Sequence, residues 1–600
     1  MAKQVKTKRE PRLKAEVTTA QRLKNILKSC RDIMRKDRGL SGDADRLPML
    51  TWLMFLKFLD DKEASFRDEA AFNNRPYLET IEQPYRWRDW AADTKLSGSD
   101  LMNFINQQKT IFADNTEGVG LFAYLCGLEH SELPRRRVVG AVFKGVLNRM
   151  VSGYLLREVI DKINQIQFNS SDDIHTLSLL YEGLLKEMRD ASGDAGEFYT
   201  PRPVVKFMVN TLAPRIGETI LDPACGTGGF LVQAFEFLTH TDDGRNPKNF
   251  QTLHNNTFSG NEVKPLPYLL CQMNLLLHGL ENPHIKDENS LKKRLGEIGD
   301  ADRVDIIITN PPFGGEEERQ IIDNFPDGFQ TAETTLLFIQ VILRRLRRAN
   351  PDTGLRGGRA AIVVPNGTLF DEGIAAKIKR DLTDDFNLHT VVRLPEGVFA
   401  PYTDIPSNLL FFEHGQPTDK IWFYEQRPPL GRKKYSKMKA IQDDDFEELN
   451  AWWSNRTEND QAWQLDLTAI KAHAKAEAQP FVDSADAARK RTQANRRKLD
   501  ALKKQFSSVQ EARKEPKFIA LEAAISEDER TENDNNKKAE RLRATAYNLD
   551  AKNPNRKPEV EYKDPSVLVN LILDNEQHIL KLLKNIQITI NETEKEDGEV

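Results

Sequence analysis

Apolar residues in the first part of the chain recur at the three- and four-residue spacing of an amphipathic helix. The runs RLKNILKSCRDIMRK and MLTWLMFLKFLDDKE show this spacing, and no stretch up to about residue 166 alternates with a period of two. We therefore predict an α-helical N-terminal domain over residues 1–166. A further helix is expected at 173–189, followed by a glycine-bearing loop.

The pattern changes after that loop, where short runs rich in β-branched residues alternate with helical runs such as PYLLCQMNLLLHGL. Alternation of this kind predicts a mainly parallel sheet wrapped by helices. Residues 167–480 are thus expected to form an α/β, Rossmann-like domain. The expected strands lie at 219–222, 257–262, 304–309, 360–365, 389–394, 408–413 and 420–425.

Residues 481–600 are highly charged and poor in β-branched residues, which predicts a C-terminal region that is helical or partly disordered. The last patterned run, SVLVNLILDNEQHILKLLKNI, has one apolar stripe along a helix. Either this chain's own domains or a different subunit would cover that stripe, and the sequence leaves both possibilities open. The stripe consists of Leu568, Leu571, Ile572, Ile579, Leu582 and Ile586.

Composition narrows the class of protein. Charged residues make up 30% of the chain and hydrophobic residues 39%, and no apolar run reaches the roughly 20 residues that span a bilayer. The first residues, MAKQVKTKRE, lack the apolar segment of a secretory signal, so a cytoplasmic protein without membrane contact is expected. The cysteines stand far apart without a CxxC pair, which predicts free thiols and no metal site.

The net charge of −5 indicates that the chain as a whole lacks the basic footprint of a protein that holds DNA alone. Contact with nucleic acid must therefore be local or shared with a partner. Basic runs at 135–137, 344–348 and 489–517 are candidates, although a solvated helix face explains each run more simply.

A glycine-rich turn, PACGTGGF, joins the expected strand TILD to the next helix. Such a turn brings backbone N–H groups close to a ligand. A Walker loop would need Lys-Ser or Lys-Thr after these glycines, and a dinucleotide fingerprint would need glycine in place of Leu231. The remaining ligand of this type is S-adenosylmethionine. Glu262, at the end of the second strand, can accept hydrogen bonds from its ribose hydroxyls.

The tetrad Asn310, Pro311, Pro312 and Phe313 follows the apolar strand VDIIIT, at the sheet edge where doubly wound folds bind ligands. The Asn310 side-chain oxygen and the Pro311 carbonyl can both accept hydrogen bonds from an exocyclic amine, and the prolines hold these acceptors rigid. Phe313 offers a face on which a base turned out of a duplex can stack. The tetrad therefore predicts methyl transfer to a planar NH2 group such as adenine N6.

Together these segments resemble the motifs of the amino-methyltransferases that act on adenine N6, and specifically the modification subunits of type I restriction-modification systems. The similar segments are GEFYTPRPVVKFMV, LDPACGTGGFLVQAF, GNE, DENSL and NPPFGG, in the family's order, and the resemblance covers about residues 23–412. It implies methylation of adenine N6 in duplex DNA with S-adenosylmethionine, on a target adenine flipped out of the duplex.

Carried over residue by residue, the resemblance also implies a cofactor site. Many relatives have Asp at the position of Asn289, and Thr200 and Pro201 also suit the N-cap and first turn of the next helix. Glu262 would hold the ribose of the cofactor, and Asn289 would approach its adenine ring. The glycine turn would contribute Asp222, Gly226, Thr227, Gly228 and Gly229. The methionine end of the cofactor would be lined by Glu197, Phe198, Tyr199, Thr200, Pro201 and Arg202.

The sequence shows no helicase pattern, nuclease-like cluster or groove-reading element. By resemblance, a specificity subunit would recognise the DNA, a restriction and translocase subunit would cleave it, and two copies of this chain would be present per complex. Residues 481–600 would dock a partner subunit. The residues leave two alternatives open: an N-methyltransferase of RNA or of a protein glutamine amide, and an inactive scaffold that binds the cofactor.

Overall fold

The computed structural model of the chain divides into two compact units, Met1–Lys552 and Asn553–Val600. The helix predicted at 173–189 lies outside the described residues, as do Glu197, Phe198 and Tyr199. The described residues are 19–166 without 73, 75 and 112–116, then 200–555 without 401, 402, 430, 437, 507 and 508, and finally 569, 572, 573, 575–577 and 579–583.

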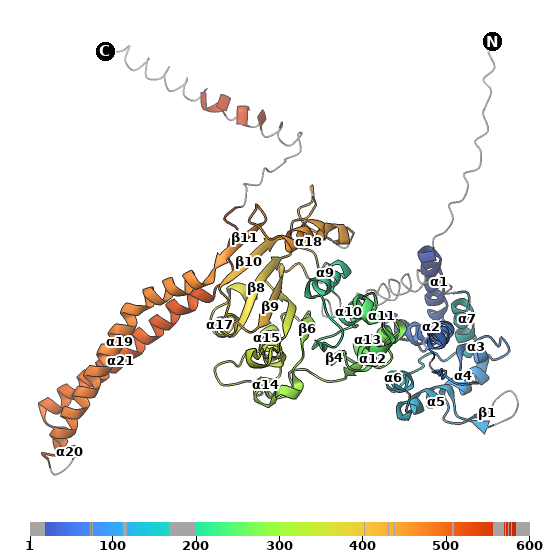
Figure 1. The fold of residues 1–600 in the computed structure, drawn as a ribbon, viewed down its shortest axis with the longest axis horizontal. Coiled ribbons are helices and arrows are strands. Elements are labelled where there is room, and N and C mark those ends of the chain that lie inside the picture. The colour runs from blue at the N-terminus through green and yellow to red at the C-terminus, as the bar shows by residue number, and fades with distance from the viewer. Residues whose placement is uncertain are drawn as a thin grey trace, which may run out of the picture. The chain divides into compact units, whose positions relative to one another are not determined.

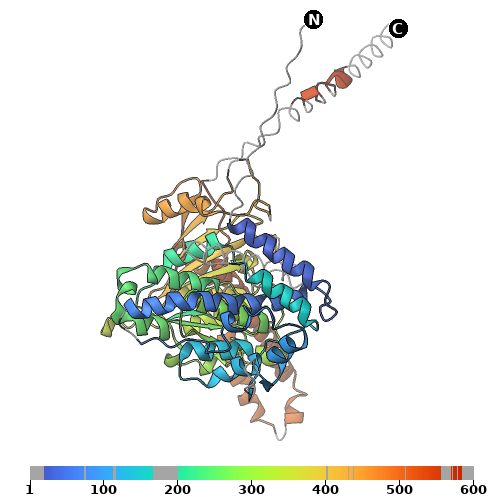
Figure 2. The ribbon, with the colours of Figure 1, turned by 90° about the vertical axis from the view of Figure 1, so that its right-hand side faces the viewer.

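The N-terminal domain is helical, which confirms the prediction (Figures 1 and 2). Its centre is α2 (Asp43–Phe72), in which every residue from 51 to 59 is buried. Neither α2 nor any other described helix is long and apolar enough to cross a membrane. The other elements are α1 (Thr19–Met34), α3 (Trp87–Trp90), α4 (Gly98–Asn106), β1 (Thr110–Ile111), β2 (Glu117–Gly118), α5 (Leu121–Gly127), α6 (Pro134–Phe143) and α7 (Gly153–Ile163).

A nine-stranded sheet in the order β11-β10-β8-β9-β7-β6-β3-β4-β5 forms the centre of the next domain. Its strands pair in parallel, except that β9 is antiparallel to β7 and β8 and β11 is antiparallel to β10. Every predicted strand is present, whereas β5 and β11 were not predicted because neither contains an apolar run. The strands are β3 (Ile220–Asp222), β4 (Phe258–Asn261), β5 (His284–Lys286), β6 (Ile306–Thr309), β7 (Arg359–Pro365), β8 (Phe386–Arg393), β9 (Ser407–His414), β10 (Lys420–Glu425) and β11 (Ala462–Asp466).

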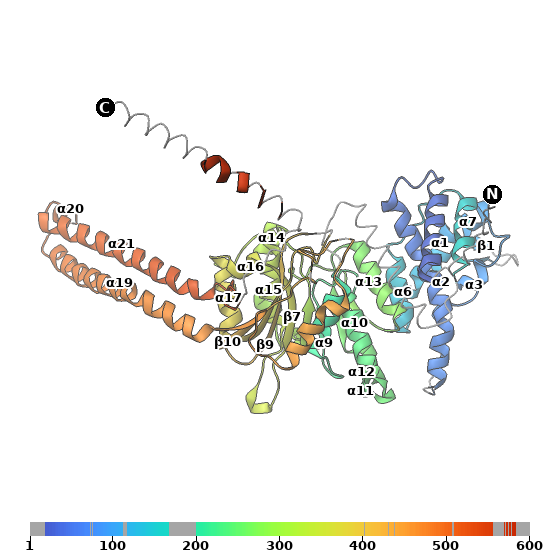
Figure 3. The same cartoon turned by 90° about the horizontal axis from the view of Figure 1, so that it is seen from above.

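Helices cover both faces of this sheet (Figure 3). Ile306 and Ile308 of β6 pack in the layer of α9, α10 and α13, whereas Ile307 packs in the layer of α15 and α17. Alternate side chains of a strand therefore enter opposite cores. The helices of this domain are α9 (Arg202–Leu212), α10 (Gly229–Thr239), α11 (Asp242–Arg245), α12 (Phe250–Asn255), α13 (Pro265–Leu277), α14 (Arg319–Ile322), α15 (Thr334–Arg345), α16 (Gly367–Phe370), α17 (Ile374–Asp384) and α18 (Glu447–Ser454).

Strands β3 and β6 are neighbours, although β4 and β5 lie between them in the sequence. The chain leaves β3 toward β4 and β5 and then returns to add β6 on the opposite side of β3. The carboxyl ends of β3 and β6 therefore meet where the strand order reverses, which is the position at which doubly wound sheets bind ligands. The loops that follow these two strands carry the glycine turn and Asn310.

Two long helices, α19 (Leu467–Lys503) and α21 (Pro516–Ala544), form a hairpin that extends away from the sheet, with α20 (Val509–Ala512) near its tip (Figures 1 and 3). The carboxylate of Asp466 accepts the Ala469 N–H at 2.8 Å and caps α19. This helix runs through residue 480, where the sequence predicts the α/β domain to end. The composition of the chain changes at that residue, but the backbone stays helical.

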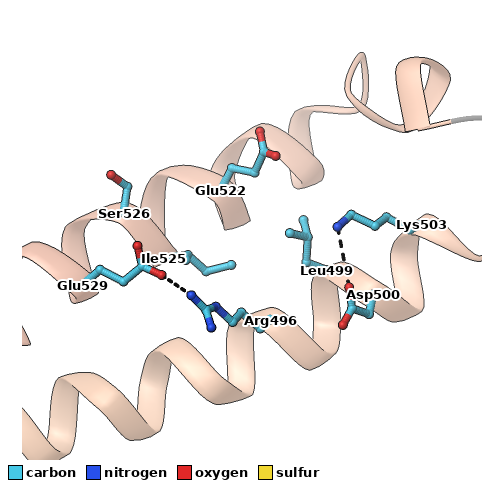
Figure 4. A pocket seen from close by; sticks show the side chains of 8 residues that line it. All are labelled: Arg496, Leu499, Asp500, Lys503, Glu522, Ile525, Ser526 and Glu529. Carbon is cyan, nitrogen blue, oxygen red and sulfur yellow. Dashed lines mark hydrogen bonds and ion pairs between the residues drawn. The ribbon is translucent and has the colours of Figure 1, made fainter.

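The basic run at 489–517 faces acidic residues within this hairpin. Arg491 pairs with Asp528 at 2.8 Å, and Arg496 pairs with Glu529 beside the groove shown in Figure 4. The other two basic runs are also used internally: Arg136 donates to the Glu79 carbonyl, and Arg347 pairs with Asp305. These contacts favour a structural role for these four arginines. The groove is lined by Arg496, Leu499, Asp500, Lys503, Glu522, Ile525, Ser526 and Glu529.

Candidate active site

The loop between β3 and α10 turns sharply at two glycines with left-handed backbone. Gly226 has a φ of +53° and Gly228 a φ of +80°, values that residues with side chains rarely adopt. The Gly228 N–H donates to the Cys225 carbonyl at 2.7 Å. A Cβ atom at Gly228 would lie 2.8 Å from Cys271 Sγ, so both backbone conformation and space require glycine at this position.

Glu262, just after β4, supports the same loop. One carboxylate oxygen accepts the Gly226 N–H at 2.9 Å and the other accepts the Lys264 N–H at 2.8 Å. The side chain is 8% exposed, and this burial raises the pKa of the carboxyl above its usual range. Glu262, the predicted acceptor for the ribose hydroxyls, therefore also holds the glycine turn in its shape.

The side chain of Asn310 is oriented by a residue far away in the sequence. Its Nδ2 group donates to the Thr200 hydroxyl at 3.0 Å, which directs Oδ1 the other way. Oδ1 is buried and has no hydrogen-bond partner among the described residues. A carbonyl oxygen in this state can accept a hydrogen bond from a ligand amine.

This contact changes the expected start of the helix after Thr200. Helix α9 begins at Arg202, with Pro201 at its N-cap, so neither Thr200 nor Pro201 has the position that the sequence predicts. The Thr200 hydroxyl does not cap this helix and instead accepts the hydrogen bond from Asn310. Thr200 is thereby linked directly to the tetrad at the end of β6.

Neighbouring elements hold the rest of the tetrad. The Thr335 hydroxyl, in α15, donates to the Pro312 carbonyl at 3.0 Å, and Pro311 is buried. Phe313 is partly buried and meets the buried ring of Phe399 edge to face, with 6.5 Å between ring centroids. The tetrad is therefore supported by side chains from other parts of the domain.

Asp222, the last residue of β3, is a second buried acceptor. Its Oδ1 accepts the Ala224 N–H at 3.1 Å, and the hydroxyl of Thr309, the last residue of β6, also interacts with this carboxyl. Burial raises the pKa of this carboxyl to about 7. Unpaired buried acceptors are rare in folded proteins, so Asn310 Oδ1 fits a ligand that brings a hydrogen-bond donor. The described residues contain no cluster of His, Cys, Asp and Glu that could hold a metal ion.

Two more predicted residues lie around the glycine loop. Arg202 donates to the Gly229 carbonyl at 3.2 Å, and burial lowers the pKa of its guanidinium to about 10. Asn289 uses its Oδ1 to accept the Leu291 N–H at 2.9 Å, next to Ser290, whose hydroxyl donates to the Pro223 carbonyl. The structure thus gathers predicted residues from several loops at one edge of the sheet.

Sequence reasoning missed the contribution of α13 to this loop. Asn274 Nδ2 donates to the Thr227 carbonyl at 3.0 Å, and Cys271 Sγ lies 3.7 Å from Cys225 Sγ. The available signal was a buried asparagine inside the apolar run LLCQMNLLL, where a polar side chain needs a partner.

Two family profiles match the chain. The profile described as HsdM N-terminal domain matches residues 23–163, and the profile described as N-6 DNA Methylase matches residues 172–479. The methylase subunit of the type I restriction enzyme EcoEI from Escherichia coli is 44% identical over 463 residues, which cover 75% of this chain and 88% of that relative. The EcoKI methylase subunit from Escherichia coli K12 is 31% identical over 381 residues, which cover 59% and 65%.

Solved structures show the same relationship. A modification subunit assigned to a type I restriction enzyme from Vibrio vulnificus YJ016 is 57% identical, has a TM-score of 0.72, and covers 76% of this chain and 94% of its own. A chain from a structure of the assembly and conformational transition of a type I system is 33% identical with a TM-score of 0.61, and covers 95% and 98%. These matches do not favour an RNA or protein methyltransferase or an inactive scaffold. The chain belongs to the N-6 DNA methylase family, as the methylase subunit of a type I restriction enzyme that transfers a methyl group from S-adenosylmethionine to adenine N6 in DNA.

Proposed function

We propose that the glycine loop binds S-adenosylmethionine and that the tetrad at the end of β6 receives one adenine turned out of duplex DNA. The observation that carries this proposal is the buried, unpaired acceptor Asn310 Oδ1, which follows β6 and lies next to the end of the neighbouring parallel strand β3 with its buried Asp222. Stacking and pairing hide the N6 amine within a duplex, so the adenine has to leave the duplex to reach a buried acceptor.

The residues of the tetrad act mainly by orientation in this proposal. Bound S-adenosylmethionine supplies a methyl group that its positive sulfur already activates. The Asn310 Oδ1 atom and the Pro311 carbonyl accept the two N6 hydrogens, which leaves the nitrogen lone pair available for the methyl group. Thr200 keeps the amide of Asn310 from rotating, Pro312 stiffens the loop, and Phe313 stacks on the base.

We assign the contacts with the cofactor to residues of the loops around the glycine turn. Glu262 takes the ribose, because each carboxylate oxygen that accepts a backbone N–H keeps a second lone pair for a hydroxyl. We assign the methionine end to residues 197–202, the loop contacts to Asp222 and residues 226–229, and the adenine ring to Asn289.

Glu262→Ala is expected to weaken S-adenosylmethionine binding by about 10- to 100-fold, because it removes the ribose acceptor and leaves two loop N–H groups without their charged partner. Glu262→Gln, which keeps one acceptor oxygen, should lose less. Calorimetry on the full chain measures both, with the exposed strand residue Glu413→Ala as the control. Unchanged affinity in Glu262→Ala would show that the cofactor binds elsewhere.

Cofactor affinity should also rise with pH. The Asp222 carboxyl is neutral below about pH 7 and charged above it, and the charged form attracts a positively charged ligand. Affinity for S-adenosylmethionine should therefore increase by up to about tenfold between pH 6 and pH 8. Calorimetry at both pH values should show this increase in the wild type and a smaller one in Asp222→Asn. An equal increase in the two proteins would remove Asp222 from the cofactor site.

The partners in this proposal are duplex DNA, a specificity subunit, and a restriction and translocase subunit, with two copies of this chain per complex. The net charge of −5 and the ion pairs of Arg347, Arg491 and Arg496 with acidic residues of this chain support shared rather than independent DNA binding. We further propose that residues 1–166, 167–480 and 481–600 act as three functional parts, the last of which docks a partner subunit.

A further inference from the structure

Helix α13 belongs to two hydrophobic cores. Cys271 and Leu275 pack in the core between one face of the sheet and the layer of α9 and α10. The opposite side of the helix packs in the core of the N-terminal domain, where it meets α2 and α6 (Figure 3). The α13 residues in this second core are Leu270, Met273, Leu276 and Leu277.

The same helix forms one wall of the glycine loop. The Asn274 side chain, only 4% exposed, donates to the Thr227 carbonyl at 3.0 Å. One turn earlier, Cys271 Sγ occupies the space into which a Cβ atom at Gly228 would project. The orientation of the peptide between Thr227 and Gly228 thus depends on α13, because glycine itself imposes little restriction on that peptide.

We propose that Asn274 is a positioning residue for the cofactor loop, and that the packing of the N-terminal domain on α13 sets the affinity for S-adenosylmethionine. This inference rests on the proposed cofactor site at residues 226–229. A rigid helix with one side in each core transmits a displacement of one core to the other, since packed interiors deform little. Loosening the side of α13 that faces the N-terminal domain should therefore change the loop through Asn274.

The local part of the inference is tested with a matched pair of substitutions on α13. Asn274→Asp keeps the shape of the side chain but places a carboxylate oxygen against the Thr227 carbonyl, and it should raise the Kd for S-adenosylmethionine about tenfold. Gln272→Glu is the control: Gln272 is equally buried on the same helix, but its amide donates to the Tyr268 hydroxyl at 3.1 Å. In the assembled complex, Asn274→Asp should raise KM for the cofactor and leave kcat at saturation within about twofold.

The long-range part is tested with Met273→Ala, which lies in the N-terminal core. It should raise the Kd for S-adenosylmethionine severalfold, whereas Ile160→Ala, in the same core but on α7, should leave the Kd unchanged because α7 packs on α1, α2 and α4. In the cofactor-free full chain, amide exchange of a peptide covering residues 221–235 should be faster in Asn274→Asp and Met273→Ala than in the two controls.

Wild-type cofactor affinity in Asn274→Asp would overturn the positioning role. Equal effects of Met273→Ala and Ile160→Ala on affinity and exchange would overturn the link to the N-terminal domain. If Asn274→Asp is too unstable to purify, the comparison of Met273→Ala with Ile160→Ala still decides that link. A failure of the cofactor site itself would appear separately, as unchanged binding in Glu262→Ala.

Discussion

Replacing Asn310 with Ala should reduce methyl transfer by about 100-fold or more while leaving S-adenosylmethionine binding nearly intact. Removing one oriented hydrogen-bonding group that acts in a transition state typically costs about 100- to 1000-fold in rate. Binding should survive because Asn310 Oδ1 is assigned to the target amine, and the side chain of Asn310 donates no hydrogen bond to the glycine loop or to Glu262. Single-turnover methylation of DNA by the assembled complex gives the rate, and calorimetry on the same variant gives the cofactor affinity.

Asn255→Ala is the matched control, because this asparagine ends α12 just before β4. It therefore lies near the amino end of that strand, whereas Asn310 follows the carboxyl end of β6. Phe313→Ala, as a companion variant, should mainly weaken capture of the base, since stacking contributes roughly 1–3 kcal/mol per base in single-strand binders. Its effect is measured as reduced fluorescence from 2-aminopurine placed at an adenine that has been mapped as methylated. Turnover near that of the wild type in Asn310→Ala would contradict the assigned role.

Deleting residues 565–600 should prevent assembly with the partner subunits and abolish site-specific methylation, with cofactor binding unchanged. Of the predicted apolar stripe, Leu568, Leu571 and Ile586 lie outside the described residues, whereas Ile572, Ile579 and Leu582 are described. These three side chains are 59%, 55% and 50% exposed, so much of their apolar surface would be left in water without a partner. We propose that a helix of the specificity subunit covers it.

Co-purification and size-exclusion chromatography measure assembly, and calorimetry checks that the truncated chain still binds the cofactor. A sharper variant is Ile572→Asp with Ile579→Asp, compared with Gln577→Asp, which adds charge to an exposed polar position of the same segment. A truncated chain that still forms the full complex would show that the stripe packs on this chain's own domains. Methylation of one defined sequence by the intact chain alone would instead reveal a recognition element within it.

Whether a segment forms a helix, a strand or a tight turn followed directly from the sequence. Helical spacing predicted α1 and α2, because one apolar stripe per turn is a property of neighbouring residues. Apolar runs predicted the central strands for the same reason, and the glycines between β3 and α10 predicted a tight turn that brings backbone N–H groups close to a ligand. The residue types for adenine methylation were also readable, since they reflect the chemistry of the amine and of the ribose.

The tertiary structure alone decided which of these residues meet. Thr200 and Asn310 are 110 positions apart, and Asn274 and Thr227 are 47 positions apart, so no local pattern couples them. The antiparallel position of β9 between β7 and β8 and the membership of α13 in two cores likewise depend on strand order and on how distant surfaces fit. Periodicity reports which face of an element is buried, whereas the partner that buries it is selected by packing over the whole chain.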